Sequence, residues 1–185
     1  MHQKQKLLGI GLFILCVGGG ISLGVSASDK ERSGGKQHRD VAPVQEKQYS
    51  ADCGSCHFAY QPGLLPARSW EKLLAGLGEH FGENAEVSQE VQNALKTYLT
   101  RNAADRVDDG RSKKIAASIA PDETPVRITE TRYFVKKHRE IPRRFWEKNP
   151  KIGSLIRCEA CHTKAEEGSF NEHEVQIPGI GRWED

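Results

Sequence analysis

The stretch Cys158-Glu159-Ala160-Cys161-His162 decides how this chain folds, and its pattern occurs a second time at Cys53-Gly54-Ser55-Cys56-His57. In a Cys-x-x-Cys-His motif, the two thiols lie on one side of a helical turn, where each can bond to one vinyl group of a porphyrin. The histidine that follows can then bind the iron as its proximal ligand. The sequence therefore predicts two covalently attached haem c groups. Their attachment residues are Cys53, Cys56, Cys158 and Cys161, and their proximal ligands are His57 and His162.

Three other uses of the four motif cysteines were weighed against haem attachment. A structural zinc site needs four ligands and usually places its two Cys-x-x-Cys pairs about 12–20 residues apart, whereas more than 100 residues separate these pairs. A thioredoxin-like dithiol would need a βαβ context that neither flank provides. Structural disulfides are the third alternative in an exported protein. Haem attachment explains both the cysteines and the histidine that follows each pair.

The first 27 residues have the features of a secretory signal peptide. Lys4 and Lys6 precede an apolar stretch over residues 7–25, and Val25-Ser26-Ala27 supplies the small residues that a signal peptidase reads. The apolar stretch is long enough to span a bilayer, so an uncleaved anchor is the alternative. Cys16 lies inside it and is interpreted as an apolar residue that is lost with the signal. Because c-type haem is attached outside the bacterial cytoplasm, the sequence predicts a periplasmic protein.

The rest of the chain divides into four predicted segments. Residues 28–44 are polar and contain glycines, which predicts a flexible leader. Residues 45–104 form a first haem module, residues 105–124 a charged linker, and residues 125–185 a second haem module with its tail. The predicted fold is mostly α: a small two-module c-type cytochrome whose long irregular segments pack around two covalent haems. Because the apolar pattern is thin, we expect the chain to be largely unfolded without its haems.

Apolar spacing and capping residues predict the helices. In the first module, one helix runs from Ser69 to Gly82 and another from Ser88 to Asn102. A short helix is expected over residues 112–119 of the linker. The second module begins with a helix that Thr129 or Thr131 caps and Pro142 ends, followed by a short helix through Phe145 and Trp146. A further helix leads from Ser154 into the second motif. No segment predicts a strand pair, and the tail from Gly168 is expected to be mostly irregular.

The charges are balanced overall but unevenly distributed. Without residues 1–27, the chain has 25 basic and 25 acidic residues. Residues 101–151 hold fourteen Lys or Arg against eight Asp or Glu, and residues 158–185 hold two against seven. This distribution favours an oriented encounter with a partner protein and not general nucleic-acid binding. The basic cluster Lys136, Lys137, Arg139, Arg143 and Arg144 is either a solvated face that also neutralises haem propionates or a docking surface for an acidic redox partner.

Met1 is the only methionine in the chain, so methionine cannot be the sixth ligand of either iron in the mature protein, and histidine is the expected ligand. The candidates are His38, His80, His138 and His173. His80 is predicted for the first haem because it follows Leu77 and precedes Phe81 on the amphipathic helix expected there. His138 is predicted for the second haem because it lies four residues after Phe134, on the same helix face. An arrangement in which each module ligates the other module's haem stays open.

Five stretches of this sequence resemble the bacterial dihaem cytochrome c family: residues 51–70 (ADCGSCHFAYQPGLLPARSW), 76–85 (GLGEHFGENA), 127–131 (RITET), 137–142 (KHREIP) and 161–170 (CHTKAEEGSF). The resemblance covers roughly residues 48–180. It implies a periplasmic electron carrier with two low-potential haems, each bound by two histidines, in a small helical protein. His57 and His162 match the family's proximal ligands, and His80 and His138 its distal ligands. The family also implies a small oxygen-binding monohaem cytochrome as acceptor and a membrane cytochrome b as donor.

The leading hypothesis is therefore an electron carrier that binds no small-molecule substrate and no nucleic acid. A haem enzyme, such as a peroxidase or a small-molecule reductase, is the alternative, and it would need one iron with an open position and an acid–base group above it. Glu79 or Glu140 could serve as that group. A gas or redox sensor is a third hypothesis, although no output domain is fused to the chain.

Overall fold

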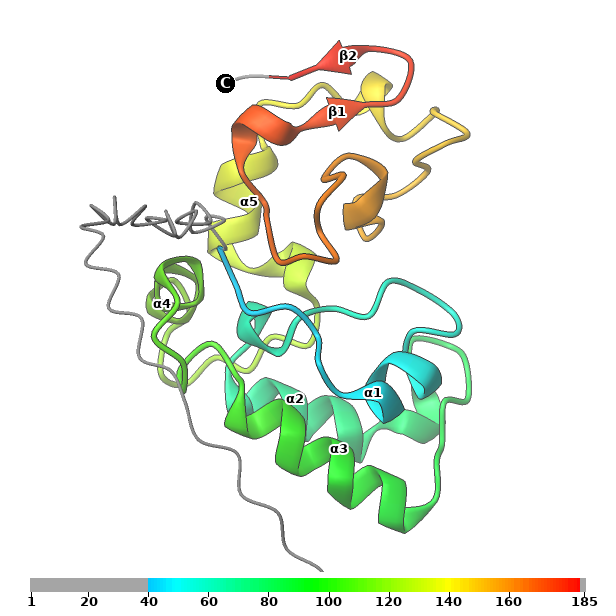
Figure 1. Ribbon diagram of the computed structural model, residues 1–185, viewed down its shortest axis with the longest axis vertical. Helices are drawn as coiled ribbons and strands as arrows, with labels where there is room; N and C mark the ends of the chain where they lie inside the picture. Colours follow the sequence, from blue (N-terminus) through cyan, green and yellow to red (C-terminus); the bar gives the residue numbers. More distant parts are fainter. Residues whose placement is uncertain (1–39, 184–185) are drawn as a thin grey trace, which may run out of the picture. The chain divides into compact units, whose positions relative to one another are not determined.

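Short helices joined by long irregular segments form most of the described structure. The computed structural model describes residues 40–183, which belong to one compact unit. Figure 1 shows the five α-helices of this range: α1 (Lys47–Asp52), α2 (Ala67–Ala75), α3 (Gln89–Arg101), α4 (Gly110–Ala117) and α5 (Arg132–His138). Single 3₁₀ turns lie at Pro62–Leu64, Leu77–Glu79, Ile128–Glu130, Arg143–Phe145, Cys158–Ala160 and Glu172–Glu174. The prediction of a mostly helical fold with long irregular segments is confirmed.

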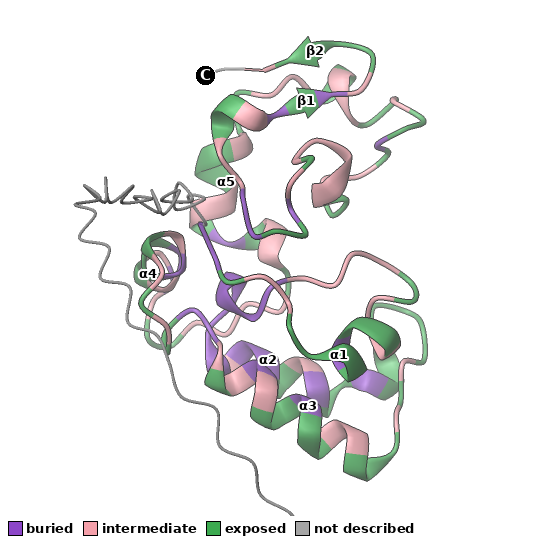
Figure 2. Cartoon of the chain, in the orientation of Figure 1, coloured by how far each residue is buried: buried purple, intermediate pink, exposed green. Residues whose placement is uncertain are grey.

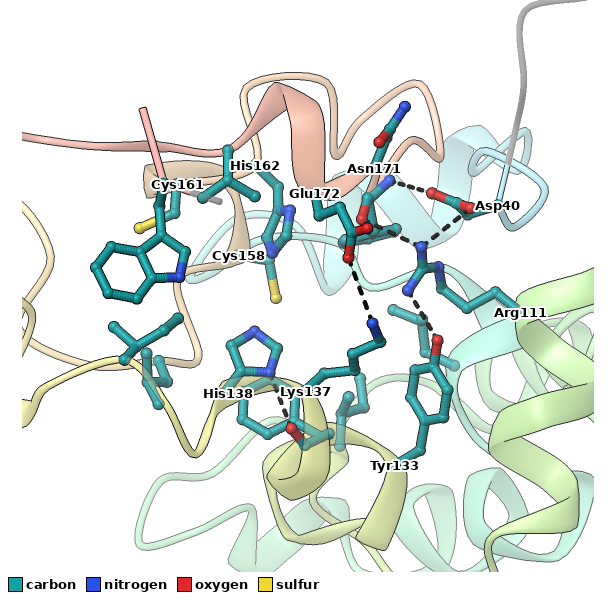
Figure 3. Close-up of a pocket in the computed structure, with 18 of the residues that line it drawn as sticks. Asp40, Arg111, Tyr133, Lys137, His138, Cys158, Cys161, His162, Asn171 and Glu172 are labelled. Carbon is teal, nitrogen blue, oxygen red and sulfur yellow. Dashed lines mark hydrogen bonds and ion pairs between the residues drawn. The ribbon is translucent and has the colours of Figure 1, made fainter. Parts of the chain in front are cut away.

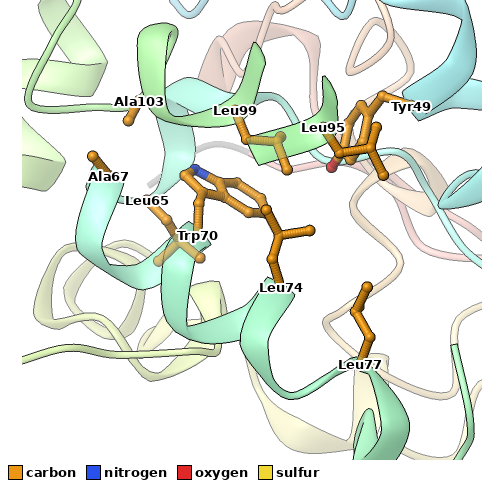
Figure 4. Close-up of a cluster of buried hydrophobic side chains, with 9 residues drawn as sticks. All are labelled: Tyr49, Leu65, Ala67, Trp70, Leu74, Leu77, Leu95, Leu99 and Ala103. Atoms are coloured by element: carbon orange, nitrogen blue, oxygen red, sulfur yellow. The ribbon is translucent and has the colours of Figure 1, made fainter. Parts of the chain in front are cut away.

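Helices α2 and α3 pack against each other and carry the largest hydrophobic core. Ser88 caps α3 as predicted, since its side-chain oxygen accepts a hydrogen bond from the Val91 amide at 3.3 Å. Leu95 and Leu99 are buried on the inner face of α3. Opposite them, the Trp70 indole of α2 donates a hydrogen bond to the Pro62 carbonyl at 2.8 Å. Figure 4 shows these residues with the rest of the core: Tyr49, Leu65, Ala67, Leu74, Leu77 and Ala103.

The helix predicted from Ser69 to Gly82 is wrong at both ends. Helix α2 begins at Ala67, directly after Pro66, and Ser69 is a buried residue of its first turn. It ends at Ala75, because Gly76 follows with φ −112° and ψ 22° and glycine is a poor helix former. Residues Leu77–Glu79 form one 3₁₀ turn, so His80 lies beyond the helix.

The other predicted helices agree with the structure except before the second motif. Helix α4 begins two residues before the predicted start, and α5 is capped by Thr131, whose hydroxyl accepts from the Phe134 amide at 3.3 Å. The helix predicted from Ser154 is wrong. Gly153 has φ +70°, and the chain then runs through turns into the single 3₁₀ turn Cys158–Ala160.

The expectation that the tail lacks a strand pair is also wrong. Strands β1 (Gln176–Ile177) and β2 (Gly181–Arg182) pair antiparallel, with Ile177 opposite Gly181. The pair has only two residues on each side, and glycines lie in and beside its turn, so no alternating apolar pattern marks it in the sequence.

The first described residues are tied to the segment that follows the second motif. The amides of Asp40 and Val41 both donate to the Gly168 carbonyl, at 3.0 and 3.2 Å. Both residues are buried. The end of the predicted leader is therefore packed against the protein, and residues 28–39 lie outside the described range. The predicted signal peptide and its alternative, a membrane anchor, lie outside it too.

Two smaller hydrophobic clusters complete the fold. One joins Val41, Leu64, Ala104, Ile115 and Ile119 from segments far apart in the sequence. The other consists of Ile152, Val175 and Ile177, next to the strand pair. Figure 2 shows that buried residues gather in the segment after the first motif and on the inner sides of α2 and α3. Among residues 40–183, no helix is long and apolar enough to cross a membrane.

Candidate haem sites

The first site brings His57 and His80 together. His57 ends the first motif, which follows α1 directly, with Cys53 as the C-cap of that helix. The imidazole rings of His57 and His80 face each other with centroids 6.2 Å apart and planes at 21°. The Nδ1 atom of His57 lies 2.8 Å from the Phe58 carbonyl oxygen, so this nitrogen can donate a proton there. That bond leaves Nε2 for a metal.

His80 is held by a tight loop that the sequence did not predict. Its amide donates to the Glu83 carbonyl at 2.7 Å, and the Glu83 amide donates back at 3.2 Å. Between them, Phe81 has φ +57°, a left-handed conformation that is rare for an aromatic residue. The Arg127 guanidinium lies 3.9 Å from the Phe81 ring centroid, which is a cation–π contact. The loop thereby turns His80 toward His57.

The second site is a cavity of about 440 Å³ between α5 and the second motif. Pockets for cofactors commonly span roughly 300–1,000 Å³. His138 and His162 line the cavity, with ring centroids 6.1 Å apart and planes at 73°. In Figure 3, Cys161 lies on one side of these two rings and Arg111 on the other. The side chains of Trp146, Trp183 and Ile152 contribute apolar walls.

Helix α5 places His138 at its last residue, one turn after Phe134. The Nδ1 atom of His138 lies 2.9 Å from the Phe134 carbonyl oxygen. The two rings are stacked with centroids 3.8 Å apart and planes at 12°. These contacts fix the ring plane and direct Nε2 into the cavity, away from the helix backbone. The Nδ1 atom of His162, by contrast, is buried and forms no hydrogen bond with any of the described residues.

The edge of the cavity that lies opposite Cys161 is polar. The Arg111 guanidinium forms an ion pair with Asp40 at 3.1 Å and donates to the Tyr133 hydroxyl at 2.9 Å. Its Nε is buried and has no hydrogen-bond partner among the described residues. Lys137 reaches Glu172 at 3.4 Å across the same edge. Sequence reasoning missed Arg111, which lies in the predicted linker, and no pattern there marks it as part of a site.

Burial keeps two of these histidines neutral, which is the form that binds a metal. Burial is the main reason that the pKa of His162 falls to about 4, and the nearby His138 and the Arg111 charge lower it further. The pKa of His80 is also lowered, first by burial and then by His57 and Arg127. Both imidazoles therefore stay unprotonated at neutral pH.

The remaining predicted residues fit the same arrangement. The four motif cysteines form no disulfide with one another in the described part of the chain, so their thiols can carry thioether bonds. His173 lies in the 3₁₀ turn Glu172–Glu174 and is exposed, and it is not in either histidine pair. His38 lies outside the described residues. Two attachment thiols, a pair of neighbouring imidazoles and, at the second site, a cavity of suitable volume fit a covalently bound haem.

Comparison with known proteins agrees with this chemistry. Residues 49–170 match the dihaem cytochrome c family. The fold is similar to that of a dihaem cytochrome c from Shewanella baltica, with 41% identity over 76% of this chain and 99% of that chain, and a TM-score of 0.63. A dihaem cytochrome c from Rhodobacter sphaeroides is 39% identical over 70% of this chain and 100% of that chain, with a TM-score of 0.62.

No curated protein matches the chain. The family match covers most of the chain, and the two similar structures are each covered almost entirely. The chain therefore belongs to the dihaem cytochrome c family, and it is a haem-based electron-transfer protein with two covalently attached haem c groups.

Proposed function

We propose that the protein is a periplasmic electron carrier in which two histidines bind each iron: His57 with His80, and His138 with His162. The distances between the facing rings carry this proposal. An imidazole nitrogen binds a metal at about 2 Å, so an iron between two imidazoles holds their ring centroids about 6 Å apart. The observed distances are 6.2 and 6.1 Å. This pairing favours ligation within each site over the crossed arrangement.

The protein's own groups prepare the axial ligands. The carbonyl oxygens of Phe58 and Phe134 hold Nδ1 of His57 and His138 and fix their ring planes. The strained turn at Phe81 holds His80, and burial keeps His80 and His162 neutral. When bound, each haem supplies an iron that accepts or releases one electron. Rigid ligands on both faces favour a carrier, because they keep other molecules from the metal.

We also propose that both haems have low reduction potentials, because histidine would occupy both axial positions of each iron. A methionine ligand raises the potential of a haem iron, and none is present in the described residues, since Met1 is the only methionine. The alternative, an enzyme with one open iron, would need one of the four histidines to be displaced.

The polar edge of the second cavity is suited to the haem propionates. In a c-type haem, the propionates extend from the side opposite the two vinyl groups, which bond to the cysteines. Figure 3 places Arg111 and Lys137 away from Cys161. The buried Nε of Arg111 can donate to a carboxylate, and Tyr133 orients the guanidinium. We therefore assign Arg111, Lys137 and Tyr133 to the propionate side of the second haem.

We propose that an acidic redox protein docks on the basic residues around α5. Lys136, Lys137, Arg139, Arg143 and Arg144 are exposed, and Lys136 and Lys137 belong to the last turn of α5 beside His138. A docked partner would thus lie near the second haem. A small oxygen-binding monohaem cytochrome as acceptor and a membrane cytochrome b as donor are the partners that we propose. The matching test is the salt dependence of electron transfer to such a partner.

The visible spectrum of the dithionite-reduced protein tests the ligation, recorded before and after carbon monoxide is added. With both irons bound by two histidines, the low-spin spectrum stays unchanged under the gas. The variants His80→Ala and His138→Ala are each expected to open one iron, so that half of the haem binds carbon monoxide. His173→Ala is the control and leaves the spectrum as in the unchanged protein.

Carbon monoxide binding by the unchanged protein would contradict the carrier proposal and favour an enzyme or a gas sensor. If His80→Ala or His138→Ala instead left the spectrum unaffected, that histidine would not be an axial ligand.

A further inference from the structure

Two consecutive residues that follow the first motif bond to the chain on either side of the second motif. The Tyr60 hydroxyl donates to the Ile156 carbonyl at 2.8 Å, two residues before Cys158. The Gln61 side-chain amide donates to the Ala165 carbonyl at 2.5 Å, three residues after His162. These bonds join residues 96 and 104 positions apart. Residues 60 and 61 therefore hold both ends of the segment that carries the second haem.

Tyr60 also contacts the first site. Its ring centroid lies 5.2 Å from that of His57, the proximal ligand, with the planes at 32°. The Tyr60 carbonyl accepts a hydrogen bond from the Tyr49 hydroxyl at 2.8 Å, and Tyr49 is a buried residue of the largest core. One side chain thus contacts an axial ligand of the first haem and bonds to the chain beside the attachment cysteine of the second.

Gln61 is fully buried, which is unusual for a long polar side chain. Its amide oxygen has no hydrogen-bond partner among the described residues. Burying a polar group costs free energy that only its hydrogen bonds offset, and an apolar residue of similar size would avoid that cost. The hydrogen bond to the Ala165 carbonyl is the interaction that offsets the cost of burying a glutamine at this position.

We propose that Tyr60 and Gln61 form an inter-site clamp, which fixes the second haem motif relative to the first and so sets the coupling between the two haems. The clamp rests on the electron-transfer function and adds positioning residues to it. Transfer between two centres depends steeply on their separation and orientation. A carrier that takes up an electron at one haem and releases it at the other needs a fixed geometry between them.

The test is the double variant Tyr60→Phe/Gln61→Leu, studied with both haems attached. Phenylalanine keeps the ring beside His57 and removes only the hydroxyl, and leucine keeps an apolar side chain of similar size. The bonds of Asp40 and Val41 to Gly168, and of Asp40 to Arg111, are independent links to the second site and remain. Tyr98→Phe is the matched control, because it also removes one tyrosine hydroxyl, which accepts at 3.1 Å from the amide of Gln45, a residue outside both motifs.

The main measurement is circular dichroism in the Soret region. Two haems held in a fixed arrangement give a paired positive and negative band, whose size falls with the square of their separation and depends on their relative angle. We expect the double variant to lose a large part of this couplet, and the separation between its two reduction potentials to shift. Tyr98→Phe is expected to retain both. Mass spectrometry establishes that both haems are attached.

An unchanged couplet and unchanged potentials in the double variant would overturn the clamp. If the double variant does not retain both haems, Tyr60→Phe alone decides the question, because it removes a single hydroxyl. A failure of the clamp can be distinguished from a failure of the proposed function. Carbon monoxide binding by the unchanged protein would contradict the ligation by two histidines, whereas the couplet reports the placement of the haems whatever their sixth ligand.

Discussion

At the scale of single residues, the two sites differ in how their imidazole planes are arranged. The rings of His57 and His80 are nearly parallel, at 21°, and those of His138 and His162 are closer to perpendicular, at 73°. The local cause differs too: a loop with a left-handed Phe81 positions His80, and a stacked Phe134 in α5 positions His138. Two haems with the same ligands are therefore expected to differ electronically.

Electron paramagnetic resonance of the oxidised protein checks this difference. Nearly parallel imidazoles raise the energy of one iron d orbital more than that of its partner, which gives a rhombic low-spin signal. Perpendicular imidazoles leave the two orbitals close in energy, which gives a strongly anisotropic signal with a larger maximal g value. We expect one signal of each kind in equal amounts, and His138→Ala is expected to remove the second. Two identical rhombic signals would contradict the ring planes described above.

A second residue-scale prediction concerns Arg111. Its positive charge is largely buried near the second site, and a positive charge near a haem disfavours the oxidised iron. The variant Arg111→Gln also removes the ion pair with Asp40. We expect the potential of the second haem to fall by an amount equivalent to about 1 kcal/mol at an effective dielectric constant of about 20.

Potentiometric titration followed by electron paramagnetic resonance measures this shift for each haem separately. Arg132→Gln is the control, because Arg132 is exposed and its ion pair with Glu123 lies on the surface. If only the potential of the first haem fell, the assignment of Arg111 to the second haem would be contradicted.

At the scale of elements, Gly168 joins the start of the described chain to the segment after the second motif. It has φ +80°, and a Cβ atom there would collide with the Val41 carbonyl oxygen. Gly168→Ala is expected to lower the free energy of unfolding by more than the roughly 1 kcal/mol that a left-handed alanine costs by itself.

Gly153→Ala is the matched control for chemical denaturation of the holoprotein. Gly153 has φ +70°, but no atom lies within 4 Å of an added Cβ. The difference between the two variants therefore measures the close backbone contact. If both variants lost the same amount of stability, the backbone at Val41 would have to move away from the added Cβ atom at little cost.

The contact between α2 and α3 should be the most sensitive part of the helical core. Leu95 is fully buried on α3, and Leu95→Ala is expected to lower the free energy of unfolding by about 2–5 kcal/mol. The neighbouring Lys96 is exposed and pairs with Glu71 at 3.3 Å, so Lys96→Ala should cost less than about 1 kcal/mol. Thermal unfolding of both variants provides the measurement. Similar melting temperatures would mean that the core at Leu95 repacks.

At the scale of the whole molecule, the two haem sites differ in how much hydrophobic core the protein itself provides beside them. The segments around the first motif also belong to the largest cluster, which α2 and α3 form without a cofactor. Around the second cavity, the buried cluster consists of Ile152, Val175 and Ile177. The second haem therefore has to supply much of the apolar surface on which residues 140–183 pack.

Hydrogen exchange of Cys158→Ala/Cys161→Ala checks this dependence. The variant cannot attach the second haem covalently, and we expect the amides of residues 140–183 to exchange much faster. The amides in the interior of α2 and α3 are expected to stay protected. The variant Cys53→Ala/Cys56→Ala provides the comparison for the first haem. If removing the second haem also exposed α2 and α3, the molecule would unfold as one cooperative unit.

The cofactor and the helical class of the fold followed from the sequence alone, and the sequence also predicted the attachment cysteines and the proximal histidines. These features are local: five consecutive residues carry the attachment chemistry, and apolar spacing with a capping Ser88 or Thr131 marks a helix. The four proposed axial ligands could be named from the sequence, because the chain has few histidines and only one methionine. Their ligation stays a prediction.

The folded chain was needed to show that His80 lies beside His57 and His138 beside His162, that a tight turn holds His80, and that Arg111 lines a polar edge. Each depends on residues far apart in the sequence or on a backbone conformation that no pattern signals. The extension of α2 to Gly82 failed because the apolar spacing continues through Leu77 and Phe81 although the helix ends before Gly76. The helix predicted from Ser154 failed because the chain there forms turns. Tyr60 and Gln61 look like ordinary loop residues in the sequence, and only the folded chain brings them to Ile156 and Ala165.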